Sequence, residues 1–253
     1  MRSVFLLLLL AGCTKTAAPV APPQSACHSE RFEGSGFILC DAGTGKIEIR
    51  TGHRSFASLQ AALGGRASGV AFAMNAGMFD DAGRPIGLMV EDGKQVRAIN
   101  KRTRGFGNFH LMPNGVFLVR KDGRAEVMTS DRYEPSPTVA FATQSGPMLL
   151  IDGKVHPSFD HDGQSRYIRN GVGIGPDGRA LFVISEGAVS FGKLARFLRD
   201  RHQVRDELFF DGAVSSLWDP ANNRMDAFTD LGPIVVAFKP AASGRRRAAP
   251  AKP

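Results

Sequence analysis

Two stretches decide the fold, VAFAMNAGMFDD (70–81) and ELFFDGAVSS (207–216), because in each an apolar run stops at one polar residue. The apolar residues predict buried strands, and Asn75 and Asp211 follow them directly. Both residue types are good turn formers, and a turn is the simplest role for either. Each stretch, however, closes a similar strand–helix–strand segment. Since carboxyl ends of parallel strands collect ligand-binding groups, we expect both side chains in one active site.

The two segments share their local signals. In the first, the alternating KIEIR (46–50) predicts a strand, Ser55 is placed to cap a helix over FASLQAAL, and Gly64-Gly65 ends it. In the second, RALFVIS (179–185) predicts a strand and Ser190 precedes the helical FGKLARFLRD. If each helix connects parallel strands, the crossover is right-handed.

Between these segments the sequence predicts β-hairpins. GLMVEDGKQVRAI (87–99) and PMLLIDGKVHP (147–157) each place Asp-Gly between apolar runs, and each is followed by a similar phrase, PNGVFLVRKDGRA (113–125) or RNGVGIGPDGRALFVI (169–184). The repeat predicts two related halves. The expected class is α+β or mixed α/β, with a central mixed β-sheet system, two β-α-β units and several hairpins.

The N-terminal residues predict export. Residues 1–12 have an arginine and a leucine run too short to span a bilayer, as in a signal peptide, and Leu10-Ala11-Gly12-Cys13 resembles a lipobox. We expect lipidation of Cys13, a Pro/Ala-rich tether over 13–26, a domain over 27–240 and a basic tail over 241–253. Thr14 follows the cysteine in place of the aspartate that is associated with retention in the inner membrane, which favours the outer membrane. We therefore expect a cell-envelope lipoprotein facing the periplasm. The remaining pair, Cys27 and Cys40, suggests a disulfide there.

The net charge of +8 does not indicate nucleic-acid binding. Six of the cations lie in the signal, tether and tail (Arg2, Lys15, Arg245, Arg246, Arg247 and Lys252), and the domain without them carries +2. One tryptophan and two tyrosines offer few platforms for base stacking.

Several familiar chemistries are not supported. SFGK (190–193) matches Ser-x-x-Lys without its partner motifs, so we expect Ser190 to be a helix cap and Lys193 a surface residue. Ser145 lies outside any nucleophile elbow. We expect a solvated loop, and no metal or cofactor, at the cluster His156, Asp160, His161 and Asp162, because no glutamate closes a calcium loop and the histidine spacing is not that of a helical zinc motif.

A set of polar residues remains at predicted strand ends and hairpin mouths: Asn75, Gln144, Ser145, Arg169, Asn170, Asp211, Ser215 and Ser216. Arginine can clasp a phosphate with two parallel hydrogen bonds. Amides and hydroxyls bind sugar hydroxyls, and a carboxylate can act as acid, base or nucleophile. The set therefore suits a sugar phosphate.

The order and spacing of five stretches resemble the phosphodiester glycosidase family: NAGMFDDAGRPIGLMVEDGK, GNFHLMPNGVF, TQSGPMLLIDGKVHP, RNGVGIGPDGR and FFDGAVSSL. The resemblance implies hydrolysis of a sugar-1-phosphodiester at the anomeric carbon, with release of the sugar and a phosphomonoester. It covers nearly the whole domain, and this chain looks more similar to the bacterial envelope members than to the animal enzyme of the family.

The family's functional elements fall on particular residues here. Asn75 to Phe79 match the Asn-Gly-Gly-Phe/Met-Phe element, with Ala76 in place of its middle glycine. Asp211, Gly212 and Ser215 match an Asp-Gly-Gly-x-Ser element, with Ala213 in place of the second glycine. The resemblance implies catalytic roles for Asp211, Asn75 and Arg169. It implies substrate binding by Gln144, Ser145, Gly146, Asn170, Gly212, Ser215 and Gly77.

Individual roles follow from this match as expectations. Arg169 and Ser215 would hold the phosphate, Asp211 would face the anomeric carbon as nucleophile or base, and Asn75 and Gln144 would orient the sugar. Asp80, Asp81 and Glu186 are further carboxylates outside the expected site. Two alternatives stay open: a non-catalytic glycan-binding lipoprotein, and a metal-dependent phosphodiesterase.

Overall fold

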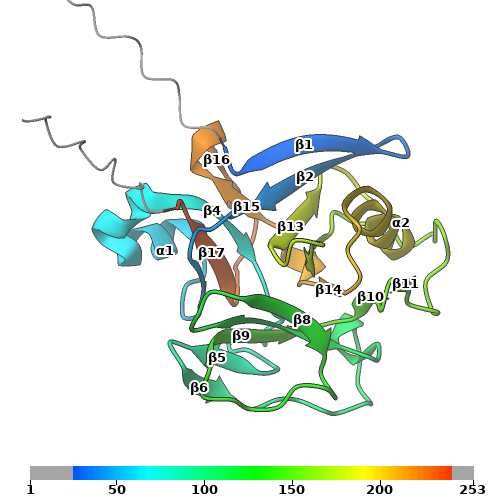
Figure 1. The fold of residues 1–253 in the computed structure, drawn as a ribbon, viewed down its shortest axis with the longest axis horizontal. Coiled ribbons are helices and arrows are strands. Elements are labelled where there is room, and N and C mark those ends of the chain that lie inside the picture. The colour runs from blue at the N-terminus through cyan, green and yellow to red at the C-terminus, as the bar shows by residue number, and fades with distance from the viewer. Residues whose placement is uncertain (1–24, 241–253) are drawn as a thin grey trace, which may run out of the picture.

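Three β-sheets hold most of the regular secondary structure in the computed structural model, which describes residues 25–240 (Figure 1). The predicted signal peptide, the lipidation site Cys13, the tether up to residue 24 and the basic tail lie outside the described residues. The last tether residues belong to the folded part, because the Ser25 hydroxyl contacts the Asp219 carboxylate at 3.0 and 3.1 Å.

The largest sheet has seven strands in the order β1-β2-β13-β12-β14-β10-β11. Their bounds in that order are Cys27–Phe32, Ser35–Asp41, Ala180–Ser185, Asn170–Ile174, Glu207–Phe209, Met148–Ile151 and Lys154–Val155. A second sheet has the order β16-β15-β4-β17-β3, with bounds Arg224–Met225, Leu217–Asp219, Val70–Asn75, Ile234–Phe238 and Ile47–Arg50. The third has the order β6-β5-β9-β7-β8, with bounds Lys94–Arg97, Met89–Glu91, Val139–Ser145, Gly115–Arg120 and Ala125–Thr129.

All paired neighbours in these three sheets of the described chain are antiparallel. The predicted α+β class is confirmed. Both predicted β-α-β units are present, but another strand lies between the two parallel strands of each unit. β17 separates β3 from β4, and β12 separates β13 from β14. The two hairpin-containing halves predicted from the repeat have matching strand orders, β6-β5-β9-β7-β8 and β11-β10-β14-β12-β13.

Each unit uses a serine-capped helix as its crossover. Helix α1 (Phe56–Leu63) begins after Ser55, whose hydroxyl accepts from the Ser58 N–H, and it ends at Gly64 with φ 54°. Helix α2 (Phe191–Arg196) begins after Ser190, which accepts from the Lys193 N–H, and a π-helical turn (Phe197–Arg201) continues it. The serines satisfy N–H groups that have no partner inside the helix.

The predicted Asp-Gly hairpins form β5–β6 and β10–β11. Both turn residues have positive φ in each, 49° and 77° at Asp92-Gly93 and 50° and 81° at Asp152-Gly153. Such turns match the right-handed twist of paired strands, and glycine adopts positive φ without steric cost. The following phrases form hairpins β7–β8 and β12–β13.

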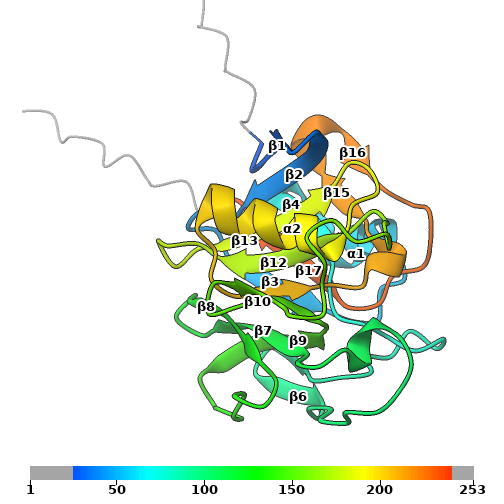
Figure 2. The same cartoon turned by 90° about the vertical axis from the view of Figure 1, so that its right-hand side faces the viewer.

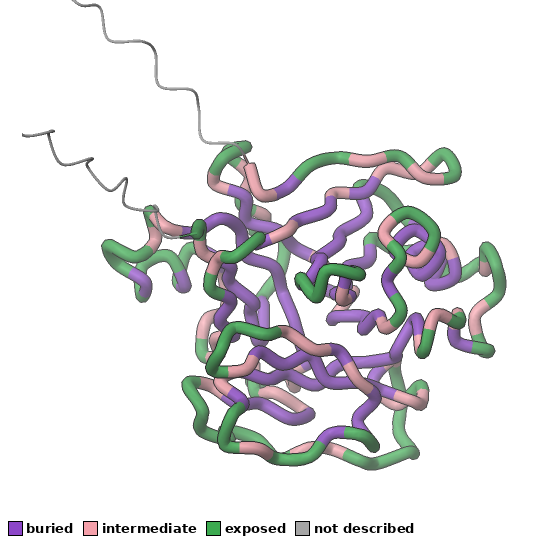
Figure 3. The backbone as a smooth tube through the Cα atoms, viewed as in Figure 1, coloured by how far each residue is buried: buried purple, intermediate pink, exposed green. Residues whose placement is uncertain are grey.

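The three sheets share one apolar core, and the helices cover outer faces (Figures 2 and 3). Phe182 of β13 lies in this core with ring centroids 5.3 Å from Phe72 of β4 and 5.5 Å from Phe117 of β7, so it joins all three sheets. Helix α2 and the π-helical turn that continues it pack on the other face of the large sheet through Leu194 and Phe197, and α1 packs against the sheet that contains β4.

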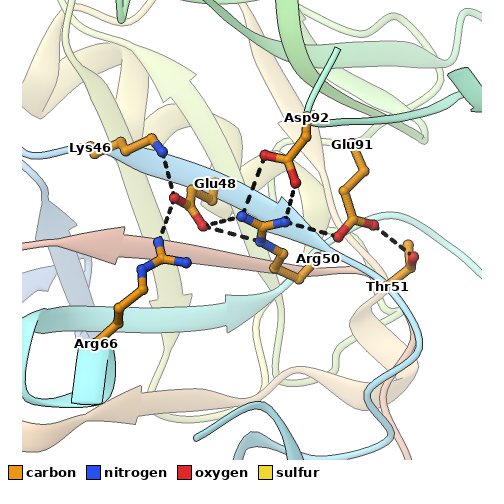
Figure 4. Close-up of polar contacts among 7 residues, drawn as sticks. All are labelled: Lys46, Glu48, Arg50, Thr51, Arg66, Glu91 and Asp92. Atoms are coloured by element: carbon orange, nitrogen blue, oxygen red, sulfur yellow. Dashed lines mark hydrogen bonds and ion pairs between the residues drawn. The ribbon is translucent and has the colours of Figure 1, made fainter. Parts of the chain in front are cut away.

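A buried carboxylate fastens the second sheet to the third (Figure 4). Glu48 of β3 is fully buried and is bound by Lys46 at 2.7 Å and Arg66 at 2.6 Å, as well as by Arg50. Burial alone would raise the pKa of Glu48, but the hydrogen bonds and charges of Lys46 and Arg50 outweigh it and lower the pKa. Arg50 also binds Glu91 at 3.1 Å, together with Asp92, across the gap to hairpin β5–β6.

The first hairpin is closed by a disulfide between Cys27 and Cys40, which face each other in the β1–β2 register. None of the helices described between residues 25 and 240 has the length and apolar character needed to cross a membrane.

Candidate active site

The strand ends at Asn75 and Asp211 meet in space, as predicted, although the two strands belong to different sheets. The Asp211 N–H donates to the Ala76 carbonyl at 3.0 Å, and the Asn75 side-chain N–H donates to the Asp211 carbonyl at 2.7 Å. The site therefore lies at a junction of sheets and not along one edge of a parallel sheet, which corrects the geometric reason for expecting it.

Asn75 is buried and its amide joins three segments. Its Oδ1 accepts from the Ser216 N–H at 2.8 Å and from the Asn170 side chain at 3.0 Å. With its Nδ2 on the Asp211 carbonyl, the amide holds the backbone on both sides of the 211–215 turn. These contacts make Asn75 a positioning residue for Asp211. This role takes the place of the contact with a sugar that we expected.

Asn170 and Ser215 extend this network. The Ser215 hydroxyl lies 2.9 Å from the Asn170 Oδ1 and 3.1 Å from the Ile168 carbonyl, and the Asn170 Nδ2 donates to the Asn75 carbonyl at 3.0 Å. A hydroxyl has one proton, so Ser215 donates to one of these acceptors at a time. Ser216, whose N–H completes the network, belongs to the site although the family match did not select it.

The Asp211 carboxylate keeps one oxygen available. Its Oδ1 accepts from the Ala213 N–H at 3.2 Å, and within residues 25–240 it makes no ion pair. Burial raises the pKa of Asp211 above its ordinary value, and the Ala213 hydrogen bond only partly opposes this. A half-buried carboxylate with a raised pKa and no counter-ion is suited to proton transfer or nucleophilic attack.

Arg169 is buried beside this turn without a carboxylate partner. Its Nε donates to the Val189 carbonyl at 2.9 Å and its Nη2 to the Ser165 carbonyl at 3.0 Å, while the guanidinium lies 3.5 Å from the centroid of the Phe191 ring. Burial lowers its pKa to about 10. The predicted two-pronged clasp on a phosphate is not available as the side chain stands, because only Nη1 is uncommitted among the described contacts.

The Phe209 ring lies close to both Arg169 and the Asp211 turn. A Cβ on Gly212 would stand 2.3 Å from this ring, which explains the glycine, and the Arg169 guanidinium lies 5.5 Å from the ring centroid. Next to Arg169, a cavity of about 170 Å³ is lined by Ser165, Phe191 and neighbouring residues. A larger cavity of about 560 Å³, lined by Gly175 and Asp206 among others, lies at the opposite ends of β12 and β14 and is remote from Asp211.

Gln144 does not face an open site. Its Oε1 accepts from the N–H groups of Leu88 and Asn100, both at 2.9 Å, and its Nε2 donates to the Asn100 carbonyl at 2.7 Å and the Asn114 side chain at 3.2 Å. All four hydrogen-bonding positions of the amide are occupied. The expected role in orienting the sugar is therefore corrected to an anchor for the chain around Asn100.

The remaining predicted residues line the packed end of β9. Ser145 is fully buried and its hydroxyl has no partner among the described residues. A Cβ on Gly77 would lie 2.7 Å from the Gln144 carbonyl, and one on Gly146 would lie 2.6 Å from Asn114. These glycines allow close packing between the strand ends, and nothing in their contacts exposes them to a ligand.

The 156–162 stretch is only partly the solvated loop that we expected. His156 is buried, with ring nitrogens 2.9 Å from the Met112 carbonyl and 3.1 Å from the Ser158 N–H. Asp162 pairs with Arg166 at 2.9 Å and Lys193 at 3.5 Å, and the Lys193 side chain is largely covered, not on the surface as predicted. Over residues 25–240, no three His, Cys, Asp or Glu side chains are arranged to hold a metal ion.

The other candidate carboxylates lie in separate settings. Asp80 accepts from the Arg84 N–H at 2.9 Å and pairs with its side chain, closing a turn. Glu186 follows β13 and its N–H donates to Gly36 of β2 at 2.9 Å. The contacts of these two place neither of them at Asp211.

Sequence reasoning missed a different carboxyl group, Glu207 of β14. It is fully buried, both of its oxygens lack a partner among the described residues, and burial raises its pKa well above the ordinary value. By strand alternation its side chain is on the same face as Phe209, beneath α2. An acidic residue at the start of an otherwise apolar run was the available signal.

We expect Glu207→Leu to stabilise the protein near pH 7, because it removes a buried polar group without a partner, a cost of about 1–3 kcal/mol. A raised folded-state pKa means that the parent loses stability as pH rises from the ordinary glutamate range through the folded-state value. The gain should therefore be largest at neutral pH and shrink toward pH ~4. Thermal unfolding across this pH range checks it, with Glu207→Gln separating charge from polarity. A Glu207→Leu variant less stable than the parent at every pH would contradict the expectation.

Comparison with known proteins identifies the family of this chain. The family model for phosphodiester glycosidases matches residues 68–231, a span that includes Asn75, Arg169 and Asp211. The chain belongs to the phosphodiester glycosidase family.

Three individual proteins show how similar the chain is to known sequences and structures. The protein YigE of Escherichia coli (strain K12) is 38% identical over 149 residues, which is 59% of this chain and 58% of YigE, so the match spans little more than half of that relative. Among solved structures, the catalytic domain of zebrafish N-acetylglucosamine-1-phosphodiester alpha-N-acetylglucosaminidase has a TM-score of 0.56 at 15% identity, covering 85% of this chain and 82% of that one. An exported protein from Burkholderia pseudomallei K96243 has a TM-score of 0.51 at 11% identity, covering 80% and 73%. These structures share the fold.

Proposed function

We propose that the protein hydrolyses a sugar-1-phosphodiester at the anomeric carbon and releases a free sugar and a phosphomonoester. The observation that carries the proposal is the Asp211 carboxylate, which is held at the junction of two sheets with one oxygen free and a raised pKa. Membership of the family supports the reaction class.

The reaction breaks the bond between the anomeric carbon and the phosphate oxygen, and the electron pair leaves with the phosphate. The oxygen of water ends on the anomeric carbon. Phosphate is already a good leaving group, so one carboxylate near the anomeric carbon can suffice, either as a nucleophile that water later displaces or as the base that takes a proton from water. Asp211 is the group with the geometry for this role.

Two features suit the phosphate. The free Nη1 of Arg169 is a cationic donor in an apolar setting, where its attraction for an anion is stronger than in water. Binding a phosphate would also compensate a buried charge that has no carboxylate partner. Its other donors stay on Val189 and Ser165, and they fix the direction in which Nη1 points.

Turnover of a panel of sugar-1-phosphodiesters in water labelled with heavy oxygen tests the proposal. The panel starts with an N-acetylglucosamine-1-phosphodiester, the substrate class in the name of the zebrafish relative. Label in the released sugar and none in the phosphate is the expected result. Label in the phosphate, with loss of activity on adding a chelator, would identify a metal-dependent phosphodiesterase instead. Saturable binding without turnover on any substrate would identify a non-catalytic glycan-binding protein.

We propose a cell-envelope setting for this activity, with a lipid anchor on Cys13 and glycans as substrates. The support is the leucine run and the lipobox-like sequence before Cys13. We expect Cys13→Ala to release the protein from the membrane fraction or leave it unprocessed. Unchanged membrane fractionation of that variant would refute the anchor.

A further inference from the structure

A cationic segment, without acidic partners among the described residues, is linked to the candidate site through Gln144. Residues 93–121 contain no aspartate or glutamate, and five cations are concentrated between 94 and 106: Lys94, Arg97, Lys101, Arg102 and Arg104. We refer to residues 94–106 as the basic segment. All five cations are exposed, and their side chains make no hydrogen bond or ion pair to any described residue.

The nearest acidic residues cannot neutralise the segment. Glu91 and Asp92 precede it directly, but both are bound by Arg50, which belongs to the buried Glu48 network of Figure 4. With its five cations set aside, the rest of the predicted domain has a net charge of −3, so the positive charge is local to this segment. Phe106 at its end is fully exposed.

The segment is anchored next to the site. The amide of Gln144 binds both the N–H and the carbonyl of Asn100, in the middle of the segment. The backbone carbonyl of the same Gln144 lies where a Cβ on Gly77 would be 2.7 Å away, and Gly77 is two residues from Asn75. One residue of β9 thus connects the basic segment to the strand end that holds Asp211.

We propose that the basic segment binds the chain of a polyanionic glycan, so that the enzyme acts on phosphodiester-linked polymers and not mainly on isolated sugar phosphates. This rests on the proposed function for the bond that is cut. Cations spaced over 94–104 match an anion that repeats along a chain, because a single phosphate can occupy only one or two of them. Phe106 offers a flat apolar face on which a sugar ring can stack. The anchoring beside the site favours a substrate over a membrane surface.

Four of the cations are neutralised in the test variant, Arg97→Gln, Lys101→Gln, Arg102→Gln and Arg104→Gln. A matched control removes four exposed cations elsewhere that also form no ion pair, Arg31→Gln, Lys154→Gln, Arg201→Gln and Arg205→Gln. The probes are the methyl phosphodiester of N-acetylglucosamine 1-phosphate and a polymer of N-acetylglucosamine 1-phosphate. Binding of the polymer is also measured in an Asp211→Asn background.

For the test variant we expect at least a ~10-fold loss in kcat/KM on the polymer at low salt, little change on the methyl phosphodiester, and a flatter salt dependence. The control should behave like the parent. Equal losses on both probes, no loss on either, or equal losses in test and control would overturn the proposal.

Two further measurements distinguish a polyanion site from a failure of catalysis and from a membrane-binding surface. If neither probe is cleaved, the proposed function fails, but weaker polymer binding by the test variant in the Asp211→Asn background would still support the polyanion site. Vesicles of phosphatidylcholine with phosphatidylglycerol test the membrane alternative. Vesicle binding that is lost in the test variant, with polymer binding unchanged, would assign the segment to a lipid surface and overturn the proposal.

Discussion

Asp211→Asn is expected to lose at least ~100-fold in kcat while its melting temperature stays near that of the parent. Asparagine keeps the side-chain oxygen that accepts from the Ala213 N–H, so the turn survives. What it loses is the negative charge and the ability to accept a proton or attack a carbon. Steady-state kinetics on a sugar-1-phosphodiester and thermal unfolding measure the two effects separately.

The chain contains a matched control for this variant. Asp219 also begins a short 3-10 helix and accepts from the N–H two residues on, at 3.2 Å, but its other contacts are Ser25 and Asn222. Asp219→Asn should leave kcat close to the parental value, as expected for a residue outside the catalytic site. Parental turnover in Asp211→Asn, with a lower melting temperature, would make Asp211 a turn residue.

The raised pKa of Asp211 adds a pH signature. An aspartate that acts as carboxylate gains activity as pH rises through its pKa, and burial moves that pKa upward. The acid limb of kcat/KM in the parent should therefore lie above the ordinary aspartate range of about 4. An acid limb at or below that range would show that another group controls the reaction.

Asn75→Asp is expected to destabilise the fold by about 3–5 kcal/mol, the cost of a buried charge without a partner. The carboxylate would still accept from the Ser216 N–H and Asn170, but it would face the Asp211 carbonyl where the amide now donates. Denaturant unfolding measures the loss. A free energy of unfolding within about 1 kcal/mol of the parent would contradict the structure.

If Asn75 positions Asp211, the Asn75→Asp variant should also show altered catalysis. Below its melting transition, kcat per folded molecule should fall, and the acid limb should move to higher pH because a second negative charge near Asp211 raises its pKa. Asn114→Asp is the control: Asn114 is equally buried and its Nδ2 donates to the Phe109 carbonyl at 3.1 Å. It should lose comparable stability without moving the pH profile of the small substrate.

Short-range signals predicted much of this fold correctly. The serine caps at Ser55 and Ser190 and the Asp-Gly hairpins depend on residues close together in sequence, so local chemistry suffices to predict them. The meeting of Asn75 and Asp211 was predicted from the repeated strand–helix–strand pattern, but the expected geometry was wrong, because the two strands belong to different sheets. A strand separates each parallel pair, and its place had no local signal. β12 was part of a predicted hairpin, but its pairing with β14 is set by the tertiary arrangement, as is all the pairing of β17.

The site residues show where sequence reasoning stops. Gln144 and Arg169 have the right chemistry for a sugar phosphate, but their donors and acceptors are largely committed to backbone groups of Leu88, Asn100 and Val189. Residue type reveals which hydrogen bonds a side chain can make, and only the fold reveals which are already made. Glu207 was overlooked for the converse reason, since its isolation is a property of packing.

The position of β17, late in the sequence but between two other strands of its sheet, affects the order in which the strands can pair. This strand, Ile234–Phe238, is near the end of the described chain, yet it provides all the pairing between β3 and β4, and its Ile234 is opposite Asn75. Until it arrives, β3 and β4 each keep an unpaired edge and Asn75 has no neighbour on that side. A chain that emerges with its N-terminus first can therefore form the hairpins β5–β6 and β7–β8 early, whereas the Asn75 side of the catalytic junction is completed only by the last strand.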